Sequence, residues 1–178
     1  SFLQQYIAKV HMKAKSALET AFMDRCVQML EKDGNVSLVL PQNWLFLQSY
    51  SSLRKDFLKN LTWNFVVWLG KGAFQTPLDV SPILILLTKS HESKSFPACD
   101  VSELDTIDKK SNGIKNYQLS SIDPKTQLKN PDHRITILEI EHEELLEKKA
   151  EVYQGLRTGD KDQFVLRFWE IGLIDSKW

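Results

Sequence analysis

Few residues in this sequence stand at the spacings that conventional catalysis requires. The histidines share no metal-ligand spacing with one another or with the cysteines, so we expect no metal site. Gly70-Lys71-Gly72 is not a strand-to-helix turn of the kind that cradles a phosphate or a dinucleotide. Five carboxylates between Glu139 and Glu147 are explained most simply as the solvated face of a helix. These patterns alone indicate a soluble α/β piece without an assigned reaction.

Two aromatic residues, Trp44 and Phe46, follow a short apolar segment at residues 36–40. Open α/β sheets bind their ligands beyond the carboxyl ends of the strands. Both rings are therefore candidates for the rim of an active site. Packing in the hydrophobic core explains them at least as well, and the sequence leaves that alternative open.

The elements around these aromatic residues follow from apolar periodicity. Residues 15–32 are predicted to form a helix, because apolar side chains recur there at four-residue steps. Those side chains are Leu18, Phe22, Cys26 and Leu30. Gly34 is suited to the left-handed exit of that helix. Residues 36–40 are short and rich in β-branched side chains, which is typical of a buried parallel strand.

A second helix and two strands are predicted next. Ser49 and the serines that follow it offer N-caps for a short helix that ends near Asn60. Residues 61–69 alternate as a strand does, with one fully apolar face. That face comprises Leu61, Trp63, Phe65, Val67 and Leu69. Residues 80–88 form another apolar strand, whose pairing we expect to begin just after Pro82.

The composition changes at Ser90. Residues 91–133 are polar and rich in Ser, Lys, Asp, Asn and Pro, and we expect a long surface insertion that is flexible at least in part. Residues 134–140 resume a strand-like alternation, and residues 141–152 are predicted to form a charged helix. We therefore expect three parts, residues 1–90, 91–133 and 134–178, and a sheet of three or four strands with an exposed edge.

Composition and charge limit the class of protein. The chain has 178 residues and is 42% hydrophobic, which is enough for one globular core. Its longest apolar runs are too short to span a bilayer, and Cys26 and Cys99 do not suggest a disulfide framework, so a cytoplasmic location fits. The net charge is zero, although residues 1–90 hold ten Lys and Arg against six Asp and Glu. A nucleic-acid partner would have to meet a local basic surface.

The order of these segments resembles the back half of gamma-type N6-adenine DNA methyltransferases, including those of restriction-modification and BREX phage-exclusion systems. Residues 18–46 resemble the family's helix and fifth strand, and residues 49–58, with Leu53-Arg54, resemble its next helix. Residues 69–74 and 83–89 resemble the hairpin that closes the sheet. Residues 154–164 resemble the Thr-Gly-Asp-Asn passage that leads into the target-recognition domain, with Lys161 in place of the usual Asn.

The resemblance implies a partial Rossmann-like sheet that ends in an antiparallel hairpin. It also implies transfer of a methyl group from S-adenosylmethionine to adenine N6 in duplex DNA, on a base flipped out of the stack. Phe74 matches the family's aromatic residue on which the flipped base stacks. Lys71 and Arg54 are candidates for contacts with DNA phosphates.

The family's Asn-Pro-Pro-Tyr motif and its cofactor-binding glycine motif are absent from this sequence, which begins at Ser1 without Met. We therefore expect a piece of a longer enzyme that, in isolation, neither binds S-adenosylmethionine tightly nor methylates DNA. The alternative is a non-catalytic α/β interaction module derived from such a domain. Under either hypothesis the exposed edge of the sheet is suited to pairing with another strand, including that of a second copy in a homodimer.

Overall fold

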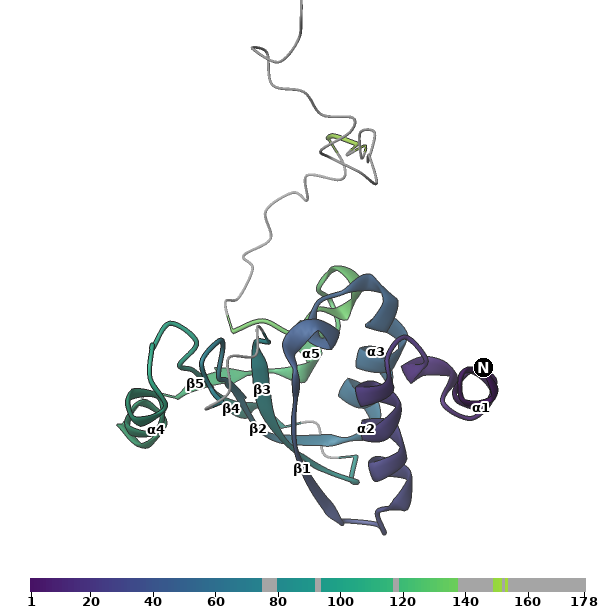
Figure 1. Ribbon diagram of the computed structural model, residues 1–178, viewed down its shortest axis with the longest axis horizontal. Coiled ribbons are helices and arrows are strands. Elements are labelled where there is room, and N and C mark those ends of the chain that lie inside the picture. Colours follow the sequence, from purple (N-terminus) through teal and green to yellow (C-terminus); the bar gives the residue numbers. More distant parts are fainter. Residues whose placement is uncertain (75–79, 92–93, 117–118, 138–148, 152, 154–178) are drawn as a thin grey trace, which may run out of the picture. The chain divides into compact units, whose positions relative to one another are not determined.

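The computed structural model describes residues 1–74, 80–91, 94–116, 119–137, 149–151 and 153. The chain divides into two compact units, Ser1–Ile140 and Glu141–Trp178, and the elements below all belong to the first (Figure 1). Within the described residues, no helix is long and apolar enough to cross a membrane.

Five strands form one sheet in the order β1-β3-β2-β4-β5 (Figure 1). They are β1 (Asn35–Pro41), β2 (Thr62–Trp68), β3 (Pro82–Thr88), β4 (Phe96–Asp100) and β5 (Ser120–Ile122). Strand β3 is antiparallel to both β1 and β2, β4 is parallel to β2, and β5 is antiparallel to β4. The α/β class and the antiparallel hairpin at β2 and β3 are therefore confirmed.

Helices cover both faces of this sheet. The α-helices are α1 (Phe2–Val10), α2 (Leu18–Met29), α3 (Ser51–Asn60), α4 (Ile107–Asn116) and α5 (Pro124–Gln127). The described residues also form short 3-10 helices, at η1 (Met12–Ala14), η2 (Gln42–Leu45), η3 (Gln48–Tyr50) and η4 (Pro131–His133). Helices α2 and α3 lie on one face, and α4 lies on the other (Figure 1).

The main hydrophobic core lies between the sheet and helices α2 and α3. Its centre is a row of aromatic rings, in which the Trp63 ring centroid lies 5.9 Å from that of Trp44 and 5.4 Å from that of Phe96. Helix α3 contributes Leu53, Phe57 and Leu58 to this core, and its end at Asn60 confirms the predicted end of the helix. Its N-cap is Tyr50, without a side-chain hydrogen bond, so the predicted serine cap is wrong.

Two features of the front half differ from prediction. Strand β1 is an outer strand that is antiparallel to β3 along its whole length, whereas a buried parallel strand was predicted. A short apolar run does not specify its partner. Helix α2 buries Ala21, Met23 and Val27, and it leaves Leu18 and Phe22 of the predicted stripe exposed. Cys26, which belongs to the predicted apolar stripe, is half-buried, and both cysteines are free.

A β-bulge divides the apolar side chains of β2 between the two faces of the sheet. The register of β2 against β3 shifts between Trp63 and Phe65. A one-residue shift moves every later side chain to the opposite face. Val66 therefore joins Trp63 in the main core, and Val67 packs with Cys99 and Val101 on the face covered by α4. The single apolar face predicted for residues 61–69 is wrong for this reason.

The polar stretch at residues 91–133 is more regular than predicted. Its described residues add β4 and β5 to the sheet, so the sheet has five strands rather than three or four. Phe96 and Ile122 reach the main core from these strands, although the stretch has few large apolar residues. Residues 134–137 form no strand, and the rest of the predicted strand at 134–140 lies outside the described residues. The segment at 154–164 also lies outside them, as does most of the helix predicted at 141–152.

Candidate functional site

The carboxyl ends of three strands meet at one edge of the sheet. Pro41, the last residue of β1, pairs with Pro82, and Trp68, the last residue of β2, pairs with Ile83 and with Asp100 at the end of β4. The segments that follow these strands, residues 42–47, 69–74 and 101–106, therefore emerge together. We call this the carboxyl edge. Open α/β sheets place their ligand sites at such an edge.

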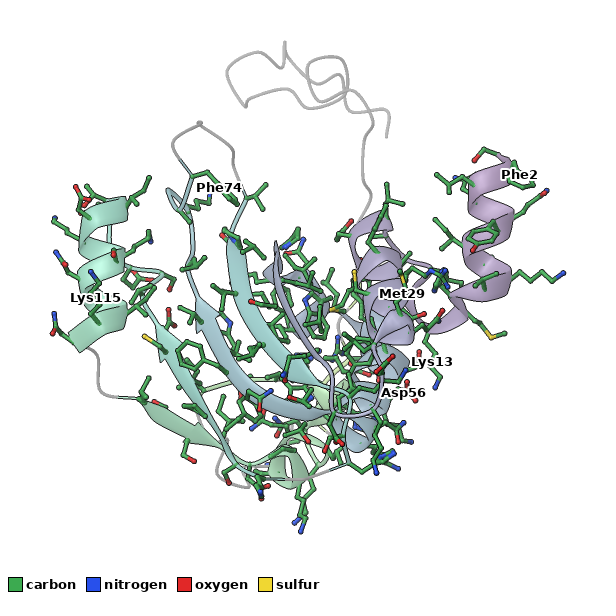
Figure 2. All side chains as sticks on the ribbon, turned by 90° about the horizontal axis from the view of Figure 1, so that it is seen from below. Phe2, Lys13, Met29, Asp56, Phe74 and Lys115 are labelled. Atoms are coloured by element: carbon green, nitrogen blue, oxygen red, sulfur yellow. The ribbon has the colours of Figure 1, made fainter. Side chains whose placement is uncertain are left out.

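Phe74 is the most exposed aromatic side chain that the described residues bring to the carboxyl edge. Its side chain is 46% exposed, on the segment that follows β2. Figure 2 shows the ring beyond the strand ends. The start of its segment is fixed by two backbone hydrogen bonds, in which the amides of Leu69 and Gly70 donate to the Pro82 carbonyl at 3.0 and 3.3 Å.

Two glycines allow this segment to pack against the segment that follows β4. Gly70 has φ +67°, and a Cβ on it would lie 2.6 Å from the Cα of Ser102. Gly72 has φ +72°, and its Cβ would lie 3.3 Å from the carbonyl oxygen of Asp105. Left-handed backbone is accessible to glycine and strained for other residues. Neighbouring backbone therefore fills the space beside both glycines, and no open cradle for a phosphate or a cofactor remains there.

Lys110 of α4 bridges the segment that follows β2 and the segment that follows β4. Its side chain is only 3% exposed, and its Nζ donates to the carbonyls of Leu69 at 2.6 Å, Val101 at 3.0 Å and Ser102 at 3.3 Å. Burial lowers the pKa of Lys110, and the neighbouring carboxylate of Asp105 partly opposes that shift. Sequence reasoning missed this residue, because the stretch around it was predicted to be a surface insertion and a lone lysine in a polar helix gives no signal of burial.

Arg54 is also buried, which corrects its predicted role. The side chain is 0% exposed, and its guanidinium donates only to main-chain carbonyls, at distances of 2.6 to 3.2 Å. These carbonyls belong to Trp44, Leu47, Asp132 and His133. A guanidinium committed in this way cannot reach a DNA phosphate. Arg54 instead holds the segment that carries Phe46 at the carboxyl edge.

The two aromatic residues predicted for the rim have different environments. Trp44 is 1% exposed and packs against Phe57 and Trp63, so its side chain belongs to the core and the rim prediction is wrong for it. Phe46 is exposed and follows η2 at the carboxyl edge. Lys71 is exposed in the segment of Phe74. The structure therefore brings Phe46, Lys71 and Phe74 to one edge. Trp44 and Arg54 are buried and cannot contact a ligand there through their side chains.

The carboxyl edge offers no evident place for a metal or for S-adenosylmethionine. Within the described ranges, no group of three or more His, Cys, Asp or Glu side chains could hold a metal ion. Asp100, at the end of β4, accepts a hydrogen bond from the amide of Ser102 at 2.9 Å and helps to close the segment after β4. The glycines of this edge are packed against neighbouring backbone and leave no cradle for S-adenosylmethionine.

Comparison with known proteins identifies the family. The N-6 DNA Methylase family profile matches residues 3–158. The Adenine-specific methyltransferase BrxX of Escherichia coli O9:H4 (strain HS) is 35% identical over 72 residues, which are 40% of this chain and 6% of BrxX. The chain thus spans a small part of the length of this relative.

Two solved structures share the fold. One is a DrdV–DNA complex, with a TM-score of 0.53 and 14% identity over 74% of this chain and 15% of that one. The other is a nuclease-deletion mutant of the Type ISP restriction-modification enzyme LlaGI in complex with a DNA substrate mimic, with a TM-score of 0.51 and 17% identity over 65% of this chain and 13% of that one. The resemblance drawn from the sequence is confirmed, and the chain belongs to the N-6 DNA methylase family.

Proposed function

We propose that this chain is the part of an adenine-specific DNA methyltransferase that receives the target base, and that the parent protein, meaning the full-length protein containing this chain, transfers a methyl group from S-adenosylmethionine to adenine N6. Family membership supports the reaction class. The adenine specificity of the relative BrxX supports adenine as the base. In such a protein the cofactor is held by residues outside this chain.

The observation that carries this proposal is the exposed ring of Phe74 at the carboxyl edge. A methyltransferase that acts on a base must extrude it from the duplex, which costs a few kcal/mol. Stacking on an aromatic ring returns about 1–3 kcal/mol per base. The start of the Phe74 segment is held by the Pro82 carbonyl and by contact with Ser102, which supports a ring kept near the carboxyl edge.

Phe46 and Lys71 complete the proposed site. Phe46 is exposed at the same edge, where it would line the rim of the base pocket. Lys71 stands three residues before Phe74, within the segment that carries the ring. Lysine binds phosphate as a compact point charge. We assign Lys71 to a phosphate beside the flipped nucleotide, a contact that weakens as salt increases.

The reaction is tested by replacing Phe74 with Ala in the parent protein and measuring the formation of N6-methyladenine. Loss of a stacking energy of about 1–3 kcal/mol predicts a fall in kcat/KM of about 5- to 150-fold. Phe74→Tyr keeps an aromatic face and should retain most of the activity. Unchanged methylation by Phe74→Ala would reject the stacking role, and a wild-type parent that methylates cytosine or no base at all would reject the reaction.

The isolated chain is expected to be inactive, and this is tested separately. Isothermal titration calorimetry of the 178-residue polypeptide with S-adenosylmethionine should show no micromolar binding, because the glycines at the carboxyl edge are packed against protein backbone. Micromolar binding by this polypeptide would contradict the assignment of the cofactor to residues elsewhere.

A separate proposal concerns the outer strand β1 and the pairing of two copies of the chain. Among the described strands, β1 pairs only with β3, on one side. The unpaired edge of a strand is a template for pairing with another strand. We propose that in the isolated chain this edge pairs with its equivalent in a second copy. Analytical ultracentrifugation should then show a dimer that Val39→Lys weakens, and a monomer at all concentrations would exclude it.

A further inference from the structure

We propose that Lys110 is a positioning residue for Phe74, so that helix α4 sets the place at which the target base stacks. This inference rests on the proposed function, because it concerns how the stacking ring is held. It assigns a role in base binding to the polar stretch that the sequence suggested to be a surface insertion.

The first step is the geometry of the ammonium group. An ammonium has three donors and no acceptor, and Lys110 has three main-chain carbonyls within 3.3 Å of Nζ. A buried charge is tolerated where its hydrogen bonds are satisfied. The shortest of the three bonds, 2.6 Å, is to Leu69, the residue at which the Phe74 segment begins. The other two are to Val101 and Ser102, in the segment after β4.

The second step is the close contact between these two segments. The amide of Val101 donates to the carbonyl of Trp68 at 2.9 Å, which extends the pairing of β2 and β4 beyond the strands. Just beyond this hydrogen bond, Gly70 lies so close to Ser102 that there is no room for a Cβ. The Phe74 segment therefore cannot slide along its neighbour, and its position is set by the position of residues 101–105.

The third step is the packing of α4 on that neighbour. A Cβ on Gly113 would lie 2.8 Å from Cδ1 of Leu104 and 3.0 Å from Cγ1 of Val101, so α4 lies directly on the segment after β4. This glycine lets the helix approach closely enough for Lys110 to pass beneath residues 101–102 and reach Leu69. The contacts thus form one path from α4 to the start of the Phe74 segment.

The surroundings of Lys110 indicate that replacing it should disturb the structure only locally. Val67, Cys99 and Val101 form a small cluster on the α4 face, separate from the main core. Replacing Lys110 would remove a donor from three carbonyls beside that small cluster, and of these the Val101 carbonyl keeps the amide of Leu104 at 3.1 Å. Among the described hydrogen bonds, none joins Lys110 to α2, α3 or β1, so these elements should keep their structure.

The test compares Lys110→Met with Lys109→Met in the parent protein. Lys109 is the adjacent residue on α4, 62% exposed, and its only described ion pair is at 3.7 Å to Asp105. We expect Lys110→Met to lower kcat about tenfold or more, with an unchanged KM for S-adenosylmethionine, because a misplaced ring lowers the fraction of bases held productively. Lys109→Met should match the wild type. An unchanged kcat in Lys110→Met would overturn the proposal.

A double variant separates positioning from general damage. If Lys110 acts through Phe74, adding Lys110→Met to Phe74→Ala should lower kcat no further. The fluorescence of DNA with 2-aminopurine at the target position should also rise less with Lys110→Met than with the wild type, since fewer bases are extruded. Independent, multiplying losses in the double variant would overturn the proposal.

Hydrogen exchange on the 178-residue polypeptide provides a readout that does not depend on activity. Lys110→Met should speed exchange at the amides of Leu69 and Gly70, and exchange in α2 and α3 should stay at the wild-type rate. Equal protection of these two amides in Lys110→Met and Lys109→Met would overturn the proposal even if the parent protein methylates no DNA. A parent without methyltransferase activity, together with the predicted exchange pattern, would reject the proposed function and leave the positioning contact intact.

Discussion

Arg54 and Lys110 are two buried cations beneath the same edge of the sheet, and both donate to main-chain carbonyls. Arg54 is buried next to the main core and holds the segment after β1. Lys110 lies at the smaller cluster on the opposite face and holds the segment after β2. Each cation thus orders one of the segments that present an exposed aromatic ring, Phe46 in the first case and Phe74 in the second.

The two cations differ in how much structure they hold. The planar guanidinium of Arg54 reaches four residues, of which Asp132 and His133 are 78 and 79 residues away in sequence. Those two residues have φ of 52° and 56°, a left-handed backbone that is strained in non-glycine residues. Lys110 reaches three carbonyls in two neighbouring segments of the carboxyl edge, and the farthest in sequence, that of Leu69, is 41 residues away. The comparison indicates that Arg54 contributes to the stability of the whole unit, whereas Lys110 contributes to local order.

The largest effect is expected from Arg54→Met. It would remove a donor from four carbonyls, of which the Leu47 carbonyl keeps the amide of Tyr50 at 3.1 Å, and each group left unsatisfied costs about 1–3 kcal/mol. We expect the free energy of unfolding, measured by urea denaturation with tryptophan fluorescence, to fall by at least about 3 kcal/mol. Arg25→Met, on the exposed side of α2, is the matched control and should stay within about 0.5 kcal/mol of wild type. A loss below about 1 kcal/mol in Arg54→Met would show that the carbonyls find other partners.

A smaller loss is expected from Lys110→Met. Fewer carbonyls lose their donor, and the surrounding apolar cluster is small, so we expect the free energy of unfolding to fall by about 1–2 kcal/mol. Lys109→Met should change it by less than about 0.5 kcal/mol, because its ion pair is exposed. If Lys110→Met destabilised the chain as much as Arg54→Met, the distinction between global and local roles would be wrong.

Next in size is the pair of glycine substitutions at the start of the Phe74 segment. Gly70→Ala places a Cβ 2.6 Å from backbone and keeps a left-handed φ, so we expect a loss of more than about 1 kcal/mol. Gly72→Ala has the same backbone strain with a longer contact of 3.3 Å, and it should be milder. Thermal unfolding by circular dichroism ranks the two. A larger loss in Gly72→Ala than in Gly70→Ala would mean that the close contact of Gly70 with Ser102 does not determine the stability of the segment.

The smallest effect concerns pH. Burial lowers the pKa of Lys110 below its ordinary value of 10.5, so the unfolded chain binds this proton more tightly than the folded chain. The penalty for burying the charge is therefore present at neutral pH and is relieved as pH rises toward 10.5. Urea denaturation should show the wild type gaining stability relative to Lys110→Met between neutral and alkaline pH. A constant difference would show that the ammonium is not penalised by burial.

Arg54 provides the contrast in that experiment. Burial lowers its pKa to about 10, so its guanidinium stays charged at neutral pH and should titrate only near pH 10. The difference between wild type and Arg54→Met is accordingly expected to stay nearly constant from neutral pH to about pH 9. A marked change in this stability difference across that range would show that Arg54 titrates there, and the contrast with Lys110 would be wrong.

The sequence predicted the elements whose apolar pattern is strong. Helix α3 and strands β2 and β3 follow from runs of large apolar side chains, and Phe74 follows from their resemblance to a known hairpin. The partner of β1, the bulge before Phe65 and the strand β4 depend on contacts between distant segments, which a local pattern does not encode. The sequence predicts Arg54 to be a surface cation for the same reason, since its acceptors are carbonyls from four separate positions.

The central claim is that the target adenine stacks on Phe74, and photo-crosslinking in the parent protein tests it most directly. DNA carrying 5-iodouracil in place of the target adenine is bound, irradiated and digested, and the cross-linked peptide is identified by mass spectrometry. The account predicts that the cross-link falls on Phe74 and is lost in Phe74→Ala, while Lys110→Met lowers its yield. A cross-link that falls on another aromatic residue and persists in Phe74→Ala would contradict the account.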